Sequence, residues 1–384
     1  MKRRAFWGLT ALLVLVALLM PSASRASDHA DPLNLTDPNA NITGLFIFPK
    51  DDQYVLIFNM RKSLTNAKPY NLGAYEYVIS IDLTTLVTFD SDEDRARYGG
   101  TIPIPDKLHP DVTIKVRLND DTTLKSIDYT GLKNTDKIRT YSGVRDDPFI
   151  FPRFFKKNVI SMVMSIPKNA FPDGQQDFIL WGATYGNGKL SDRVGRSIRS
   201  QLPRFPLLNF YDPKDQVREL AKAKDFLDKV ANFLDDKKEW WSQAIAGLLE
   251  FTFQFRKYDL APDVMIFTTR FPPGYPNGRQ LPDDVNAIQC RTGDCLLQEL
   301  SFIEGGWPRA TKNDKDFLPD FPYLAEPFPD SPERVRTDSI WPYVIPVIVV
   351  FAVLTWGLVE IVWRLIRWLW RTIKFKFRRK LAPA

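Results

Sequence analysis

The chain has 384 residues, of which 13% are aromatic and 29 are prolines, a composition that excludes a disordered stalk. Its formal net charge of +6 is unevenly distributed, because twelve of the 52 basic residues lie in two terminal segments. Without these and the single acid of a C-terminal apolar run, 40 basic and 45 acidic residues remain. A region with a net charge near −5 argues against nucleic acid as a partner.

Residues 1–26 have the pattern of a signal peptide. Three basic residues at positions 2–4 precede an apolar run at 5–20, and small residues follow it. The alternative is an uncleaved anchor helix, for which the run is short, since a bilayer span takes about 20 residues. We therefore expect cleavage before Ser27 and export to the periplasm, by the Sec route or, because of the arginine pair, by the twin-arginine route.

Residues 42–184 alternate short β-type runs with turn residues. Runs rich in β-branched and aromatic residues predict strands at 45–48, 54–60, 75–83, 112–118, 138–142, 159–166 and 178–184. Turn sequences separate them at 71–73, 90–94, 99–100 and 172–174. The fold is thus expected to be mainly β, an antiparallel β-sandwich-like domain.

The next segment changes to a helical pattern. Apolar residues recur at spacings of three and four from position 217, which predicts a helical hairpin inserted at about 213–255. After position 258 the chain is rich in proline and is expected to lie over the β core as loops. The exported domain would therefore span 27–327, followed by a linker at 328–340.

The two cysteines, Cys290 and Cys295, are separated by four residues that include a glycine. In an oxidising compartment such a pair predicts a local disulfide. A zinc or haem site would need more soft ligands, and the two histidines are distant in sequence.

Residues 341–363 are almost continuously apolar and match the thickness of a bilayer core. Tryptophan and tyrosine lie at the first edge and tryptophans at the second, where amphipathic rings prefer the headgroup region. Residues 364–384 contain eight cations and no acid, so the positive-inside bias places this tail in the cytoplasm. We expect a single transmembrane helix in the lipid bilayer and a basic tail along the anionic inner leaflet. Glu360 and Arg364, at i and i+4, would form a local ion pair.

Several short motifs follow one another along the exported region. They are Ser-Asp-His-Ala-Asp-Pro-Leu at 27–33, Asp-Pro-Asn-Ala-Asn-Ile-Thr at 37–43, Gly-Val-Arg-Asp-Asp-Pro-Phe at 143–149, Asp-Arg-Val-Gly-Arg at 192–196, Gly-Tyr-Pro-Asn-Gly-Arg at 274–279, Asp-Asp-Val at 283–285 and Phe-Pro-Tyr-Leu at 321–324. In these motifs the chain resembles the bacterial family catalogued as domain of unknown function 4331, over most of residues 27–327. Ala30, Asn41 and Gly44 depart from the family pattern. The resemblance implies secretion and a mainly β fold, but no reaction, substrate or catalytic residue.

A metal-ligating set is the first candidate site. His29, Asp31 and Asp37 combine an imidazole with carboxylates, and would hold a divalent cation if folding brought Asp146 and Asp147 alongside. The alternative is an N-terminal arm held by hydrogen bonds.

A polar-ligand pocket is the second candidate site, formed if the charged loops converge. Its residues would be Arg145, Asp146, Asp147, Asp192, Arg193, Asn277, Arg279, Asp283 and Asp284. The alternative is that each loop uses its charges for turns and ion pairs.

The sequence contains no recognisable nucleophile elbow, phosphate-binding loop, dinucleotide fingerprint or zincin motif. The leading hypothesis is therefore a membrane-anchored periplasmic module, non-catalytic, that binds a ligand or a partner protein. A periplasmic metal-dependent enzyme and an accessory subunit of a membrane-protein complex are the alternatives.

Overall fold

The computed structural model describes residues 38–64, 70–201, 206–236, 242–243, 245–246, 260–305 and 308–329, and the single residues Trp363, Arg367 and Trp370. The chain divides into two compact units, one of Ala26–Pro332 and one of Met1–Arg25 with Glu333–Ala384. The expected signal peptide, the N-terminal metal-ligating residues and, apart from Trp363, the expected transmembrane segment lie outside the described residues. Within the described part, no helix combines the length and apolar character that crossing a bilayer requires.

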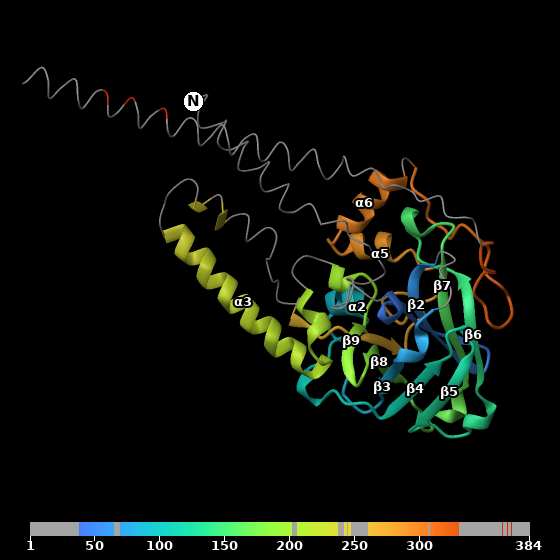
Figure 1. The fold of residues 1–384 in the computed structure, drawn as a ribbon. Helices are drawn as coiled ribbons and strands as arrows, with labels where there is room; N and C mark the ends of the chain where they lie inside the picture. The colour runs from blue at the N-terminus through green and yellow to red at the C-terminus, as the bar shows by residue number, and fades with distance from the viewer. Residues whose placement is uncertain are drawn as a thin grey trace, which may run out of the picture. The chain divides into compact units, whose positions relative to one another are not determined.

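The larger unit is built mainly from two antiparallel sheets, which confirms the predicted β class (Figure 1). The first sheet has the order β1 (Ile42–Lys50), β2 (Gln53–Leu64), β7 (Asn158–Pro167) and β6 (Arg139–Asp146). The second has the order β10 (Met265–Thr268), β8 (Asp177–Gly186), β3 (Tyr75–Asp82), β4 (Val112–Leu118) and β5 (Leu124–Thr130). Strand β9 (Lys189–Val194) pairs with β8 as well.

The two sheets share one hydrophobic core, as the layers of a sandwich do. Alternate residues of β7, such as Ile160 and Met162, and of β3, such as Tyr77 and Ile79, belong to the same buried cluster. Because successive side chains of a strand point to opposite faces, this alternation turns one face of each sheet toward the other.

Part of the outer face of each sheet is buried too. Phe46 and Val163 on the first sheet pack against Leu281 and Leu324, from the proline-rich region. On the second sheet, Trp181 and its neighbours pack against a segment that contains the helix α2 (Asp92–Tyr98). Burial on both faces explains why β7 is buried at all ten positions and reads as an unbroken apolar run.

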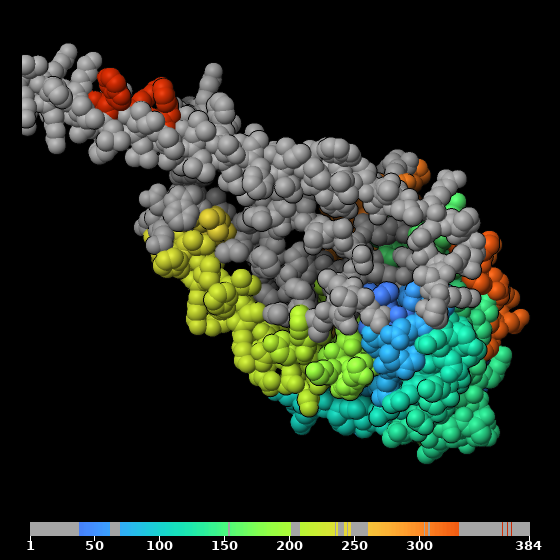
Figure 2. All heavy atoms as spheres, in the orientation of Figure 1, coloured from blue at the N-terminus to red at the C-terminus, as the bar shows by residue number. Residues whose placement is uncertain are grey.

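Helices lie at the periphery of the sheets. The helix α3 (Pro213–Asp236) occurs where the first arm of the helical hairpin was predicted, and it runs along the surface in Figures 1 and 2. Its Leu220 side chain is buried, whereas Phe226, expected on the same buried face, is 66% exposed. Of the second arm only residues 242–243 and 245–246 are described, and these are helical.

Two short helices, α5 (Val285–Arg291) and α6 (Leu296–Gly305), interrupt the region that was expected to consist of loops. They lie side by side in Figure 1 and share a cluster with Phe149. Cys290 and Cys295 form a disulfide at their junction, as predicted.

Candidate ligand-binding cavity

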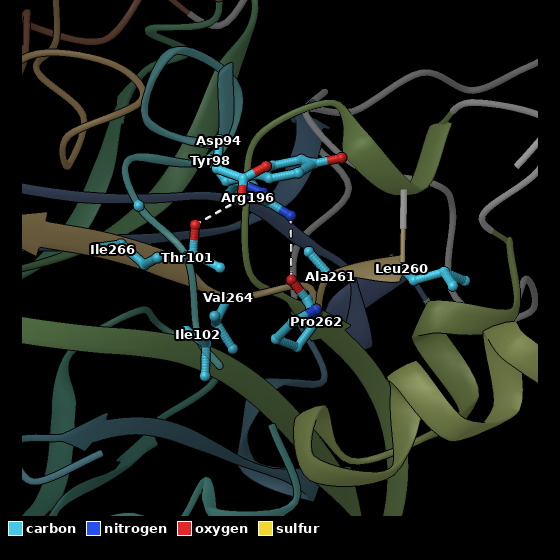
Figure 3. A pocket seen from close by; sticks show the side chains of 11 residues that line it. Asp94, Tyr98, Thr101, Ile102, Arg196, Leu260, Ala261, Pro262, Val264 and Ile266 are labelled. Atoms are coloured by element: carbon cyan, nitrogen blue, oxygen red, sulfur yellow. Dashed lines mark hydrogen bonds between the residues drawn. The ribbon is translucent and has the colours of Figure 1, made fainter. Parts of the chain in front are cut away.

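A cavity of about 110 Å³ lies beside the outer face of the second sheet (Figure 3). Four polar side chains line it, those of Asp94, Tyr98, Thr101 and Arg196. The remaining lining residues are mostly aliphatic: Gly100, Ile102, Leu260, Ala261, Pro262, Val264 and Ile266. The cavity thus combines a polar wall with an apolar wall, the usual composition of a small-molecule site.

The backbone that carries Arg196 is held rigidly. The backbone N–H groups of Gly195 and Arg196 donate to the carboxylate of Asp263, at 3.2 and 2.9 Å. A Cβ atom on Gly195 would lie 2.0 Å from the Asp263 carbonyl oxygen, so only glycine permits this close approach. The end of β9 is therefore fixed against the segment that follows residue 260.

The guanidinium group of Arg196 is buried, with the residue only 2% exposed. It lies 4.0 Å from the centroid of the Tyr98 ring, and its Nη2 donates to the Pro262 carbonyl at 3.1 Å (Figure 3). Within the described residues, it has no other hydrogen bond and no carboxylate in ion-pair contact. Its charge is balanced by a ring face and a carbonyl dipole alone, which leaves it open to an anion.

Arg199 reinforces the positive charge beside the cavity. Its guanidinium lies 5.0 Å from the same Tyr98 ring and donates to the carbonyls of Ala261 and Pro262. Both guanidinium groups, of Arg196 and Arg199, therefore contact the Tyr98 ring and donate to the Pro262 carbonyl.

The rest of the polar wall comes from α2 and the segment after it. Thr101 Oγ1 donates to Asp94 Oδ2 at 2.5 Å, and the Asp94 backbone N–H donates to Ser91 Oγ at 3.1 Å, which caps α2. Gly99 ends the helix with a left-handed φ of 78°, which glycine adopts without steric cost.

The first predicted loop lies at the end of β6, where its side chains contact the C-terminal part of the unit. Arg145 Nε donates to Tyr141 Oη at 2.9 Å, and Arg145 forms an ion pair with Glu326 at 2.5 Å. Asp146 is buried and accepts a hydrogen bond from Asn313 Nδ2 at 2.6 Å. Asp147 Oδ1 accepts from the Phe149 backbone N–H at 3.0 Å, in an Asp-Pro turn.

The second predicted pair lies on β9. Asp192 Oδ2 accepts from the Ile42 backbone N–H at 2.7 Å, which ties β9 to the start of β1. The Arg193 side chain forms an ion pair with Asp212, which lies just before α3. Within the described part of the chain, the Nε and Nη1 atoms of Arg193 are buried without a hydrogen-bond partner.

The third predicted group organises the loop after β10. The Asn277 side chain exchanges hydrogen bonds with the backbone of Thr268 at 2.7 and 3.0 Å. Asp283 Oδ2 accepts from two backbone N–H groups, at 2.7 and 2.8 Å. Asp284 caps α5 and pairs with Arg309.

Arg279, the remaining residue of that group, is buried against aromatic rings. Its guanidinium lies 3.9 Å from the Phe46 ring centroid and 6.0 Å from that of Phe149.

The structure brings the predicted loops together through apolar side chains rather than through their charges. Phe149, Ile198, Tyr275 and Val285, which follow or lie within these motifs, form one buried cluster. The charged residues face different partners around it. A ligand role for them stays a prediction, and the cavity is built from other side chains.

The metal site also stays a prediction, because His29, Asp31 and Asp37 are not among the described residues. Within the described ranges, no three His, Cys, Asp or Glu side chains come close enough to hold a metal ion.

The sequence pointed to only part of this cavity. Arg196 closes the Asp-Arg-Val-Gly-Arg motif at 192–196, so a signal for it existed, although Asp192 and Arg193 were favoured. Asp94 belongs to a predicted turn at 90–94, and no sequence motif singles out Tyr98 or Thr101.

Comparison with known proteins adds no relative. The chain matches no model of a protein family, and no curated protein is similar enough to count as related.

Proposed function

We propose that this protein is a membrane-anchored periplasmic binding module with a β-sandwich domain, non-catalytic, which holds a small polar ligand in the cavity beside Arg196. The observation that carries the proposal is the buried Arg196 guanidinium at the cavity wall, which no carboxylate of the described residues neutralises. A buried charge is costly unless something pairs with it. A bound ligand would supply that partner.

The contacts of the other charged residues support a binding role over a catalytic one. Asp192, Asp283 and Asp284 each accept hydrogen bonds from backbone N–H groups of turns, strand ends or helix starts. Carboxylates used in this way hold the backbone in place rather than move protons.

Export and anchoring rest on the sequence and on one structural feature. The apolar run at 341–363 and the basic tail at 364–384 favour a membrane anchor with a cytoplasmic C-terminus. The disulfide between Cys290 and Cys295 supports export, because disulfides persist mainly in oxidising compartments.

The test is ligand screening on the full chain in mild detergent. We expect at least one small polar compound to raise the melting temperature and to bind with one-to-one stoichiometry in calorimetry. Arg196→Gln should weaken that binding at least tenfold, since a hydrogen bond to a charged group contributes about 1.5–3 kcal/mol.

Arg218→Gln is the matched control, because Arg218 is an exposed arginine of α3 that pairs with Asp215. It should bind like the natural chain. The proposal fails if no compound of any charge class binds, or if the ligand found binds Arg196→Gln with unchanged affinity.

A further inference from the structure

We infer that the cavity binds a short aliphatic monocarboxylate, an inference that rests on the binding function proposed above. Four properties of the cavity lead to this class of ligand: its charge, its size, its apolar wall and the position of Asp94.

The positive charge of the site favours an anion, and the planar guanidinium favours a planar anionic group. The Nη2 of Arg196 is bonded to Pro262, while Nε and Nη1 have no hydrogen-bond partner within the described part of the chain. Each of the two edges of a guanidinium includes Nη2, together with either Nε or Nη1. The second Nη2 hydrogen, which Pro262 does not accept, therefore leaves one edge whose two N–H groups match the two oxygens of a carboxylate. The Tyr98 ring beneath it fixes the plane of that edge.

The size of the cavity limits the ligand to a few heavy atoms. A cavity of about 150 Å³ takes up benzene, which has six carbon atoms. The present cavity, of about 110 Å³, is smaller, so a carboxylate group with a chain of two or three carbons fills it.

The wall formed by Ile102, Val264 and Ile266 suits the tail of such a ligand. These side chains are aliphatic, and offer neither a donor nor an acceptor to a polar tail. Each methylene that a ligand buries there should raise its affinity about fourfold.

Asp94 adds selectivity against a second negative charge. Its carboxylate lines the same cavity and is held there by Thr101. A dicarboxylate or a doubly charged phosphate would bring like charge close to it, which is unfavourable at low dielectric. A single carboxylate can pair with Arg196 and keep its tail away from Asp94.

The experiment is calorimetry on the full chain in mild detergent and a buffer free of carboxylates, with butyrate as the probe. Butyrate should bind one to one, and propionate about fourfold more weakly. Butyramide, which has the same shape without the charge, should bind at least tenfold more weakly. Succinate and inorganic phosphate should also bind more weakly than butyrate.

Variants separate this site from binding elsewhere. Arg196→Gln should lose at least tenfold in butyrate affinity, and Arg218→Gln should keep it. Thr101→Val removes the hydroxyl group that holds Asp94 without a large change of volume. It should therefore reduce the preference for butyrate over succinate, with a melting temperature close to that of the natural chain.

Two kinds of result overturn the inference. If butyramide, succinate or phosphate binds as tightly as butyrate, or if another compound binds through Arg196 and butyrate does not, the ligand class is wrong while the binding function stands. If no compound binds at all, both fail.

Discussion

The carboxyl group of Asp146 lies buried at the end of β6, in contact with Asn313 Nδ2 at 2.6 Å. The pKa of Asp146 is raised to about 7, mainly by burial and to a smaller extent by the nearby carboxylate of Asp314. The hydrogen bond from Asn313 and the charge of Lys315 act in the opposite direction without cancelling the effect of burial. Asp146 thus takes up a proton in the folded protein at a pH where an exposed aspartate does not.

This shift predicts how stability depends on pH. An unfolded aspartate has a pKa of about 3.9, so between about pH 4 and pH 7 the folded state binds more protons at Asp146 than the unfolded state. The free energy of unfolding should therefore fall as pH rises through this window and level off above about pH 7. A pKa difference of one corresponds to about 1.4 kcal/mol.

Asp146→Asn, which keeps the shape without the charge, isolates this effect. At pH 8 the Asp146→Asn variant of the full chain should have a higher melting temperature than the natural chain. This difference should vanish toward pH 4. Scanning calorimetry across pH 4–8 checks this, with the exposed Asp136→Asn as control. Equal pH profiles for Asp146→Asn and the natural chain would contradict the assignment.

At the scale of elements, the junction of α5 and α6 is closed by the disulfide between Cys290 and Cys295. The bond restricts a short loop of the unfolded chain, for which the chain-entropy model gives about 2 kcal/mol. Val285 of α5 and Leu297 of α6 pack with Phe149, so loosening this junction also loosens the cluster behind the predicted loops.

The double variant Cys290→Ser and Cys295→Ser should lower the free energy of unfolding by up to about 2 kcal/mol. A reductant should destabilise the natural chain and leave the double variant unaffected. Denaturant titrations with and without dithiothreitol measure both effects. Alkylation of both cysteines in the natively exported, unreduced protein would show that the bond does not form there.

The strands themselves were predictable to different degrees. The seven predicted runs correspond to β1, β2, β3, β4, β6, β7 and β8. Three strands were missed, each for its own reason: β5 is largely exposed and polar, β9 carries charged residues that were read as a loop motif, and β10 has only four residues. Their strand conformation depends on pairing with a neighbour, as β10 pairs with β8 far earlier in the chain.

At the scale of the whole molecule, the expected anchor predicts that the protein resides in the membrane. Truncation after Asp338 should release the protein into the soluble periplasmic fraction, because it removes the apolar run at 341–363. Removal of 364–384 alone should leave it in the membrane fraction. Carbonate extraction followed by immunoblotting distinguishes these outcomes. Recovery of the full chain in the soluble fraction would contradict the anchor.

The residue pattern alone is enough to identify the β class, the helix at α3 and the disulfide. Such features depend on local periodicity, as in the apolar run of β7, or on there being only one possible pair of cysteines. They require no knowledge of which distant segments meet.

The use of each charged residue was decided only by the tertiary structure. Arg196 meets Pro262, and Asp146 meets Asn313, across 66 and 167 residues of sequence. The contacts of a buried charged group depend on which groups the fold places beside it. No local sequence pattern shows which groups these are. In the structure, side chains of the motifs at 143–149 and 274–279 contact turns, strand ends and aromatic rings. A ligand role for them stays a prediction. The cavity, and the Arg196 guanidinium that no carboxylate of the described residues neutralises, form only where β9, α2 and the segment after residue 260 come together.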